Sequence, residues 1–168
     1  MKKMKRLVAV LLAGIMALAV LTACGGTPSA PVTRDEALEK SVAEWTVELG
    51  KGANLELTQD ATLTSISDKC LSAMVKIYEA KDEDAAKAAE KELKKAFVAA
   101  TKGKKVAPVA VYIPGTKVTK DALAQAVQND MSNIQTDLER FGVNKPTKFG
   151  VTATKQKDYT LIFFMVSE

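Results

Sequence analysis

Tyr159-Thr160-Leu161-Ile162-Phe163-Phe164-Met165-Val166 is the stretch that decides the fold of this chain. It is rich in β-branched and aromatic residues, which favour a strand. A second β-rich run, from Lys148 to Thr154, precedes it, and Lys155-Gln156-Lys157 separates the two runs. We therefore expect an antiparallel hairpin whose second strand is the most buried strand of the protein.

A third strand and a long helix are predicted upstream of the hairpin. Val106 to Ile113 has the composition of a strand, and Pro108 suggests that this strand lies at a sheet edge or begins irregularly. The helix is expected from about Lys120 to Arg140, with Thr119 as its N-cap. Its expected inward-facing residues are Leu123, Val127, Met131, Ile134 and Leu138.

Three more helices are predicted in the first half of the folded region. They span about Arg34 to Gly50, Asp60 to Glu79 and Lys81 to Gly103. In the first of them, Thr33 and Glu36 have the spacing of a capping box. Apolar residues recur at intervals of three and four in these segments, which indicates one buried face per helix. The expected buried residues include Leu38, Val42, Trp45, Leu49, Leu63, Ile66, Cys70, Ala73 or Met74, Ile77, Ala86, Leu93, Phe97 and Ala100.

The N-terminus has the features of an export signal. Four basic residues among the first six precede an apolar run from Leu7 to Leu21. This run leads into Leu21-Thr22-Ala23-Cys24, which is followed by two glycines. The pattern resembles the lipobox of bacterial lipoproteins, in which the chain is cleaved before the cysteine and the thiol receives a diacylglyceryl group.

The lipoprotein resemblance implies a protein anchored to the extracytoplasmic face of the cell membrane. Residues 1–23 would be the signal peptide, and Cys24 would carry the lipid, with acyl chains such as palmitate. Residues 25–33 read GGTPSAPVT and favour neither helix nor core, so residues 24–33 are expected to be the lipidated cysteine and a flexible tether. The alternative is a retained anchor helix, for which the apolar run is short. Residues 34–168 match a single domain.

Charge and cysteine content exclude several kinds of partner and chemistry. The predicted signal peptide holds four of the 24 basic residues and none of the 20 acidic ones, so the mature protein is neutral and gives no reason to expect nucleic acid as a partner. Cys70 is the only cysteine besides Cys24. A catalytic cysteine needs an activating base, usually histidine, and the chain has no histidine. We therefore expect Cys70 to be a small buried apolar residue.

The predicted order is three helices, a strand, a helix and a hairpin. It favours an α+β fold in which about four helices pack on an antiparallel sheet of about three strands. The segment from Asn54 to Leu63 is similar to the L-x-L-T-x-D-x-x-L entry to the second helix of the CAP superfamily, which is named for cysteine-rich secretory proteins, antigen 5 and pathogenesis-related proteins. Gly115, Asn133-Ile134, Phe149-Gly150-Val151 and the strand from Tyr159 follow in that family's order. The resemblance implies an αβα sandwich.

The CAP resemblance also implies a site that this chain lacks. Asp130 stands where the family has a histidine three residues before Asn133, and the family's other histidine is missing. The family's metal site, built from two histidines and two glutamates, is therefore expected to be absent. We predict no cofactor and no metal, because the phosphate-binding and zinc motifs are also missing.

The remaining candidate site lies beside the fourth predicted helix. Asp130, Asn133 and Asp137 border its apolar face, where a few polar contacts would fix an otherwise apolar ligand. We expect a tethered binding module that recognises a peptide, lipid or wall component of the cell envelope, with no assigned catalytic residue. The alternative is an envelope hydrolase that uses the two carboxylates in a CAP-like cleft. A solvated helix edge without function is the structural alternative.

Overall fold

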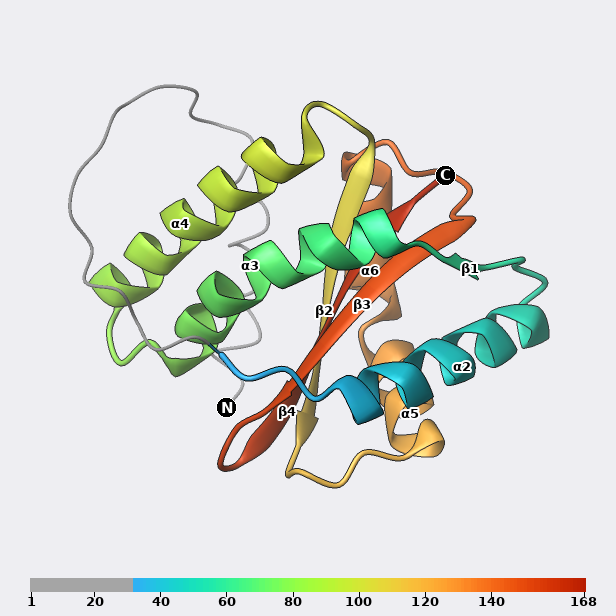
Figure 1. Ribbon diagram of the computed structural model, residues 1–168, viewed down its shortest axis with the longest axis horizontal. Coiled ribbons are helices and arrows are strands. Elements are labelled where there is room, and N and C mark those ends of the chain that lie inside the picture. Colours follow the sequence, from blue (N-terminus) through green and yellow to red (C-terminus); the bar gives the residue numbers. More distant parts are fainter. Residues whose placement is uncertain (1–31) are drawn as a thin grey trace.

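The computed structural model describes residues 32–168, and Cys24 with the rest of the predicted anchor lies outside them. This part of the chain is an α+β unit with five helices and four strands (Figure 1). The helices are α2 (Glu36–Gly52), α3 (Ala61–Glu79), α4 (Glu83–Thr101), α5 (Lys120–Asn129) and α6 (Met131–Arg140). The strands are β1 (Thr58–Gln59), β2 (Val106–Pro114), β3 (Lys148–Lys155) and β4 (Tyr159–Ser167).

The sheet has the strand order β1-β3-β4-β2, so β4 lies between its two long neighbours. Both β3 and β2 pair with β4 in antiparallel orientation. The predicted hairpin is confirmed, and six consecutive β4 residues, Thr160 to Met165, are buried. β2 is an edge strand, as Pro108 suggests.

The expectation of about three antiparallel strands is wrong in one respect. A fourth strand, β1, pairs with β3 in parallel orientation, with Thr58 opposite Lys148 and Gln59 opposite Phe149. Both of its residues are exposed. A strand of two residues has no apolar alternation, so only its pairing with β3 identifies it.

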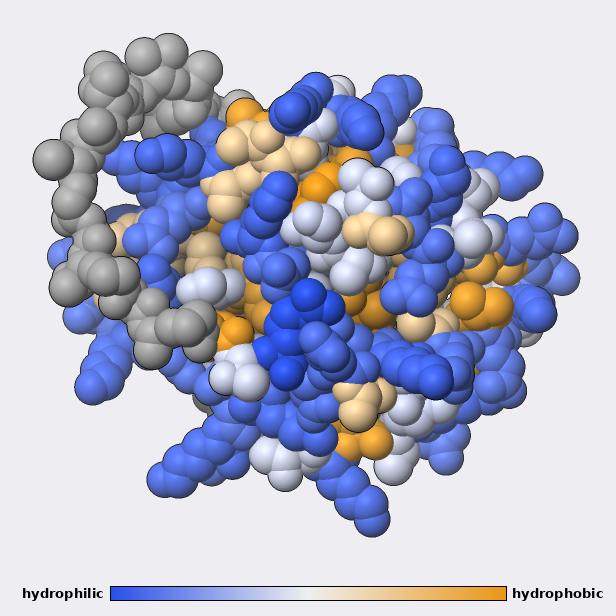
Figure 2. All heavy atoms as spheres, viewed as in Figure 1, coloured by the Kyte–Doolittle hydropathy of each residue, from blue (hydrophilic) through white to orange (hydrophobic). Residues whose placement is uncertain are grey.

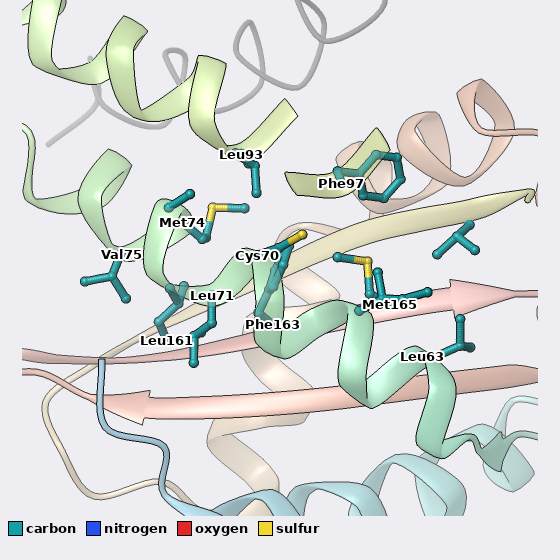
Figure 3. Close-up of a cluster of buried hydrophobic side chains, with 13 residues drawn as sticks. Leu63, Cys70, Leu71, Met74, Val75, Leu93, Phe97, Leu161, Phe163 and Met165 are labelled. Atoms are coloured by element: carbon teal, nitrogen blue, oxygen red, sulfur yellow. The ribbon is translucent and has the colours of Figure 1, made fainter. Parts of the chain in front are cut away.

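Helices cover both faces of the sheet, because successive side chains of a strand point to opposite sides. Leu161, Phe163 and Met165 pack in the core cluster that α3 and α4 complete. Ile162 and Phe164 pack in the other cluster, with α2 and α5. Figure 3 shows Cys70 and Met74 of α3 above β4, with Leu93 and Phe97 reaching them from α4. The result is a three-layer arrangement whose outer face carries mostly hydrophilic side chains (Figure 2).

Most helices begin at a residue whose polar side chain caps the first turn. The side chains of Asp60 and Thr119 accept hydrogen bonds from the third residue after them, as expected of N-caps. The predicted capping box at Thr33 is wrong. Asp35 caps α2 instead, by accepting from the Leu38 amide at 2.9 Å, because the residues before it bind to the sheet.

The single helix predicted over residues 120–140 is also wrong, because it divides at Asp130 into α5 and α6. Asp130 adopts φ −110° and ψ 10°, outside the helical region. Asn129 and Asp130 are poor helix formers, since their side chains compete for backbone hydrogen bonds. The break changes the helix phase, and Met131, expected inside, is 47% exposed.

Helix α3 lies directly on β3 at Gly150. A Cβ atom at this position would stand 2.0 Å from the Thr64 backbone nitrogen, so only glycine permits this approach. One turn further along, the Ser67 hydroxyl lies 2.7 Å from Thr152 Oγ1 and 2.7 Å from the Phe163 carbonyl oxygen. Ser67 has one hydroxyl proton, which it donates to the carbonyl, so Thr152 is the donor between the two hydroxyls.

The first described residues form a strap, Thr33 to Asp35, that is bound to the end of β3. The Asp35 amide donates to the Ala153 carbonyl at 2.8 Å, and Thr154 Oγ1 donates to the Thr33 carbonyl at 2.8 Å. Arg34 makes a bidentate ion pair with the buried Glu39 carboxylate at 2.9 and 2.5 Å. Glu39 also accepts from the Ala153 amide. The strap therefore joins α2 to the sheet.

Candidate functional site

Asp130 and Asn133, two of the three residues predicted to contact a ligand, lie at the α5–α6 junction, and Asp137 lies further along α6. Asn133 Nδ2 donates to Asp130 Oδ1 at 2.5 Å, so these two side chains are held against each other. Asn133 is exposed, and Asp130 and Asp137 are partly buried. Because they are spaced by three and four residues along α6, all three lie on the same side of this helix.

Asp137 has an unusual electrostatic environment for a helix-edge carboxylate. Burial is the main cause that raises its pKa to about 6; the charge of Arg140 opposes this rise, and that of Asp130 adds to it. A pKa close to neutral is suited to proton transfer, but it also follows simply from partial burial of a carboxylate. Asp137 is therefore the most chemically distinctive member of the predicted site.

A tyrosine cluster lies next to this junction. The chain has three tyrosines, and all of them meet here although they come from α3, β2 and β4. The ring centroid of Tyr112 is 5.7 Å from that of Tyr78 and 5.1 Å from that of Tyr159, with both pairs stacked. Tyr78 and Tyr159 are 6.1 Å apart. Tyr112 is 43% exposed, so one ring of the stack is open to solvent.

Carboxylates act on the tyrosine hydroxyls from two sides. Burial raises the pKa of Tyr78 to about 12, and the negative charge of Asp130 contributes to the rise. Burial also raises the pKa of Tyr159, and the charge of Glu79 adds to it. The Tyr159 hydroxyl is buried and has no hydrogen-bond partner among residues 32–168. We call Tyr78, Tyr112, Tyr159 and Asp130 the tyrosine surface.

Sequence reasoning identified the carboxylates of this region but missed the tyrosines. Tyr112 lies in a predicted edge strand, where an aromatic residue between buried neighbours Val111 and Ile113 must face the opposite side of the sheet. That alternation was available from the sequence. The contact between Tyr112 and Tyr78 could not be predicted from the sequence, because it depends on where α3 crosses the sheet.

The other candidate residues have structural roles. Cys70 is fully buried, and burial raises the pKa of its thiol to about 12, which confirms the predicted apolar role. Trp45 packs, partly buried, against the cluster under α2. A cavity of about 440 Å³ lies at the strap, lined by Thr33, Arg34, Asp35, Glu36 and Lys155. Three of its charged side chains are already paired: Lys155 Nζ lies 2.6 Å from Asp35, and Arg34 pairs with Glu39.

Two absences apply to residues 32–168 only. No group of three or more acidic residues or cysteines is placed to hold a metal ion in this part of the chain. Within the same residues, no helix has the length and apolar composition needed to cross a bilayer. Comparison of the whole chain with protein-family models, curated proteins and solved structures finds no match.

Proposed function

We propose that this chain is a lipid-anchored protein of the cell envelope whose domain acts as a binding module. The anchor is proposed from the sequence Leu21-Thr22-Ala23-Cys24 after a charged and apolar leader. The strap supports the arrangement, because it attaches the start of the domain to β3 directly after the proline-containing tether. The protein would lie on the extracytoplasmic face of the membrane, held by lipid on Cys24.

The observation that carries the binding role is the tyrosine surface. Tyrosine rings offer a large apolar contact area together with polar groups, which is the composition of many recognition sites. Tyr112 is exposed while Val111 and Ile113 beside it in β2 are buried, and the charge of Asp130, which accepts a hydrogen bond from Asn133, acts on the cluster. This combination supports recognition of an envelope component by a ring-lined surface with a few polar contacts.

We also propose that the domain is a degenerate relative of the CAP fold. Helices on both faces of the sheet support this proposal, as does the close packing of α3 at Gly150 within Phe149-Gly150-Val151. Asp130 at the family's histidine position would then be part of a binding surface in place of a metal ligand.

A hydrolase that uses carboxylates is the alternative function. The observation that favours it is the raised pKa of Asp137 beside a second carboxylate, Asp130. One protonated and one ionised carboxylate can act as general acid and general base. Activity of the purified protein on a panel of hydrolase substrates, lost in Asp137→Asn, would establish this alternative.

The anchor is tested by Cys24→Ala with fractionation of cells and labelling by a fatty acid analogue. We expect the wild-type protein to carry the label and to sediment with membranes. The Cys24→Ala variant should lose the label, and Cys70→Ala should keep it. Equal labelling of wild type and Cys24→Ala would rule out the lipid anchor.

The binding role is tested by retention of the purified protein on isolated envelope fractions. Tyr112→Ala and Asp130→Asn should each reduce retention. Glu44→Gln is the matched control, because Glu44 is exposed on α2, across the sheet from the tyrosines. Retention that is equal in all four proteins would contradict a role for this surface.

A further inference from the structure

We propose that the tyrosine surface binds an organic cation, such as a quaternary ammonium group, at the exposed ring of Tyr112. This inference rests on the proposed binding role of the same surface and adds the chemical class of the ligand. It follows from the stacked rings, the exposure of Tyr112, and the negative charge of Asp130 and Glu79 that acts on the cluster.

The first step is the electron distribution of the rings. The face of an aromatic ring carries partial negative charge, so a cation within about 6 Å of the ring centroid is attracted to it. Tyr112 stacks with Tyr78 and Tyr159 at 16° and 24° between ring planes. Its neighbours therefore hold the exposed ring in place without closing it off from solvent.

The second step is the charge around the cluster. The charge of Asp130 acts on Tyr78 and that of Glu79 acts on Tyr159, so negative charge from α3 and from the α5–α6 junction reaches the cluster. A ligand with net positive charge is attracted by both groups. An anionic ligand would be repelled by the same carboxylates and by the ring faces.

The third step selects a soluble cation over a lipid headgroup. A zwitterionic headgroup brings a phosphate close to its ammonium group, and that phosphate would approach Asp130 or Glu79. Like-charge repulsion then opposes the attraction of the ammonium group. A small organic cation without a neighbouring anion has no such cost.

The experiment is a titration of the full chain, solubilised in non-ionic detergent and labelled with isotope only in tyrosine. Because the three tyrosines of the chain all belong to the cluster, each ring signal in the NMR spectrum reports on this surface. The two probes are choline and its uncharged carbon isostere, in which a tert-butyl group replaces trimethylammonium. We expect saturable shifts of the Tyr112 ring with choline and binding about tenfold weaker with the isostere.

Variants distinguish the contribution of the Tyr112 ring to choline affinity from that of the Asp130 charge. Tyr112→Phe should retain most of the affinity for choline, whereas Tyr112→Leu, which keeps an apolar side chain without a ring, should lose about fivefold or more. Asp130→Asn should weaken choline binding, and Glu44→Gln on α2 should not. For Tyr112→Leu the shifts of Tyr78 and Tyr159 are followed, and their unchanged positions without ligand show that the cluster is folded.

Each outcome decides a different proposal. Equal affinity for choline and the isostere would overturn the preference for cations and leave the binding role of the surface standing. No ring shift with either probe would overturn the cation proposal, while retention on envelope fractions that depends on Tyr112 would still support the proposed function. Binding only to vesicles of zwitterionic lipid, with none to choline, would overturn the choice of a soluble ligand.

Discussion

Gly150 is the described glycine at which the fold has the least room for a side chain. Alanine at this position would place its Cβ 2.0 Å from the Thr64 nitrogen and 2.1 Å from the Leu63 carbonyl carbon. Backbone atoms of a helix cannot move aside singly, so α3 must shift away from β3. We predict that Gly150→Ala lowers the free energy of unfolding by about 2–3 kcal/mol or more, measured by urea denaturation.

A matched control is available in Gly52 at the end of α2. A Cβ there has no other atom within 4 Å. Gly52→Ala should change stability by less than about 1 kcal/mol, because only local helix propensity is altered. Similar losses in both variants would show that α3 does not pack on β3 as closely as described.

Asp137 provides a pH-dependent prediction. Its pKa in the folded protein is about 6, above the ordinary value of 3.8. Protonation therefore favours the folded state: this stabilisation is complete below about pH 3.8 and is lost as the pH rises through about 6. Asp137→Asn should reduce the pH dependence of stability in this window. Carboxyl NMR titration checks the pKa directly, and Asp130→Asn should lower it, because the charge of Asp130 raises it.

The environment of some single residues could be predicted from the sequence, and that of others could not. The apolar spacing around Cys70 predicted its burial correctly, because a helix face depends only on local periodicity. Gly150 could be matched to a family pattern, but its close contact with Thr64 depends on the crossing of α3 over β3. The tyrosine cluster depends in the same way on three elements at once.

At the scale of the elements, a buried ion pair holds the strap to α2 and to the end of β3. Glu39 is 6% exposed and accepts hydrogen bonds from both Arg34 and the Ala153 amide. Glu39→Gln removes the buried charge and leaves Arg34 with only the more distant Asp68 carboxylate at 3.5 Å, so we predict a loss of about 2 kcal/mol. Proteolysis near residue 33 should also become faster, because the strap would detach more often from β3.

Glu83→Gln is the comparison for this prediction. Glu83 pairs with Lys87 at 2.7 Å on the exposed surface of α4. Its loss should leave the denaturation midpoint nearly unchanged, because exposed pairs contribute little. Equal effects of the two substitutions would mean that the strap contributes no more than a surface contact.

Elements with strong local patterns were predicted from sequence, and those set by tertiary contacts were not. The hairpin, the first three helices and the edge strand β2 follow from composition and periodicity. The break at Asp130 divides a continuous apolar pattern, which periodicity alone cannot show. The strand β1 exists only through its pairing with β3.

On the scale of the whole molecule, the layers should differ in local stability. β4 is covered on both faces and paired on both edges, whereas α4 packs mainly on α3. We predict that amides of Ile162 to Phe164 exchange with solvent only by global unfolding, and that amides of α4 exchange by a smaller opening. Native-state hydrogen exchange at increasing denaturant measures both. Identical opening free energies and denaturant dependence for β4 and α4 would contradict the prediction.

The central position of β4 has a consequence for the order of folding. β4 follows every other described element in the chain, yet β2 and β3 both pair with it. While the chain is being synthesised, neither β2 nor β3 has its β4 partner until the last segment emerges, and the part of α3 that packs on β4 stays uncovered until then. Such pairing between distant segments slows folding and prolongs exposure of apolar surface. A chain interrupted before Tyr159 would therefore be an aggregation-prone fragment that chaperones or proteases must remove.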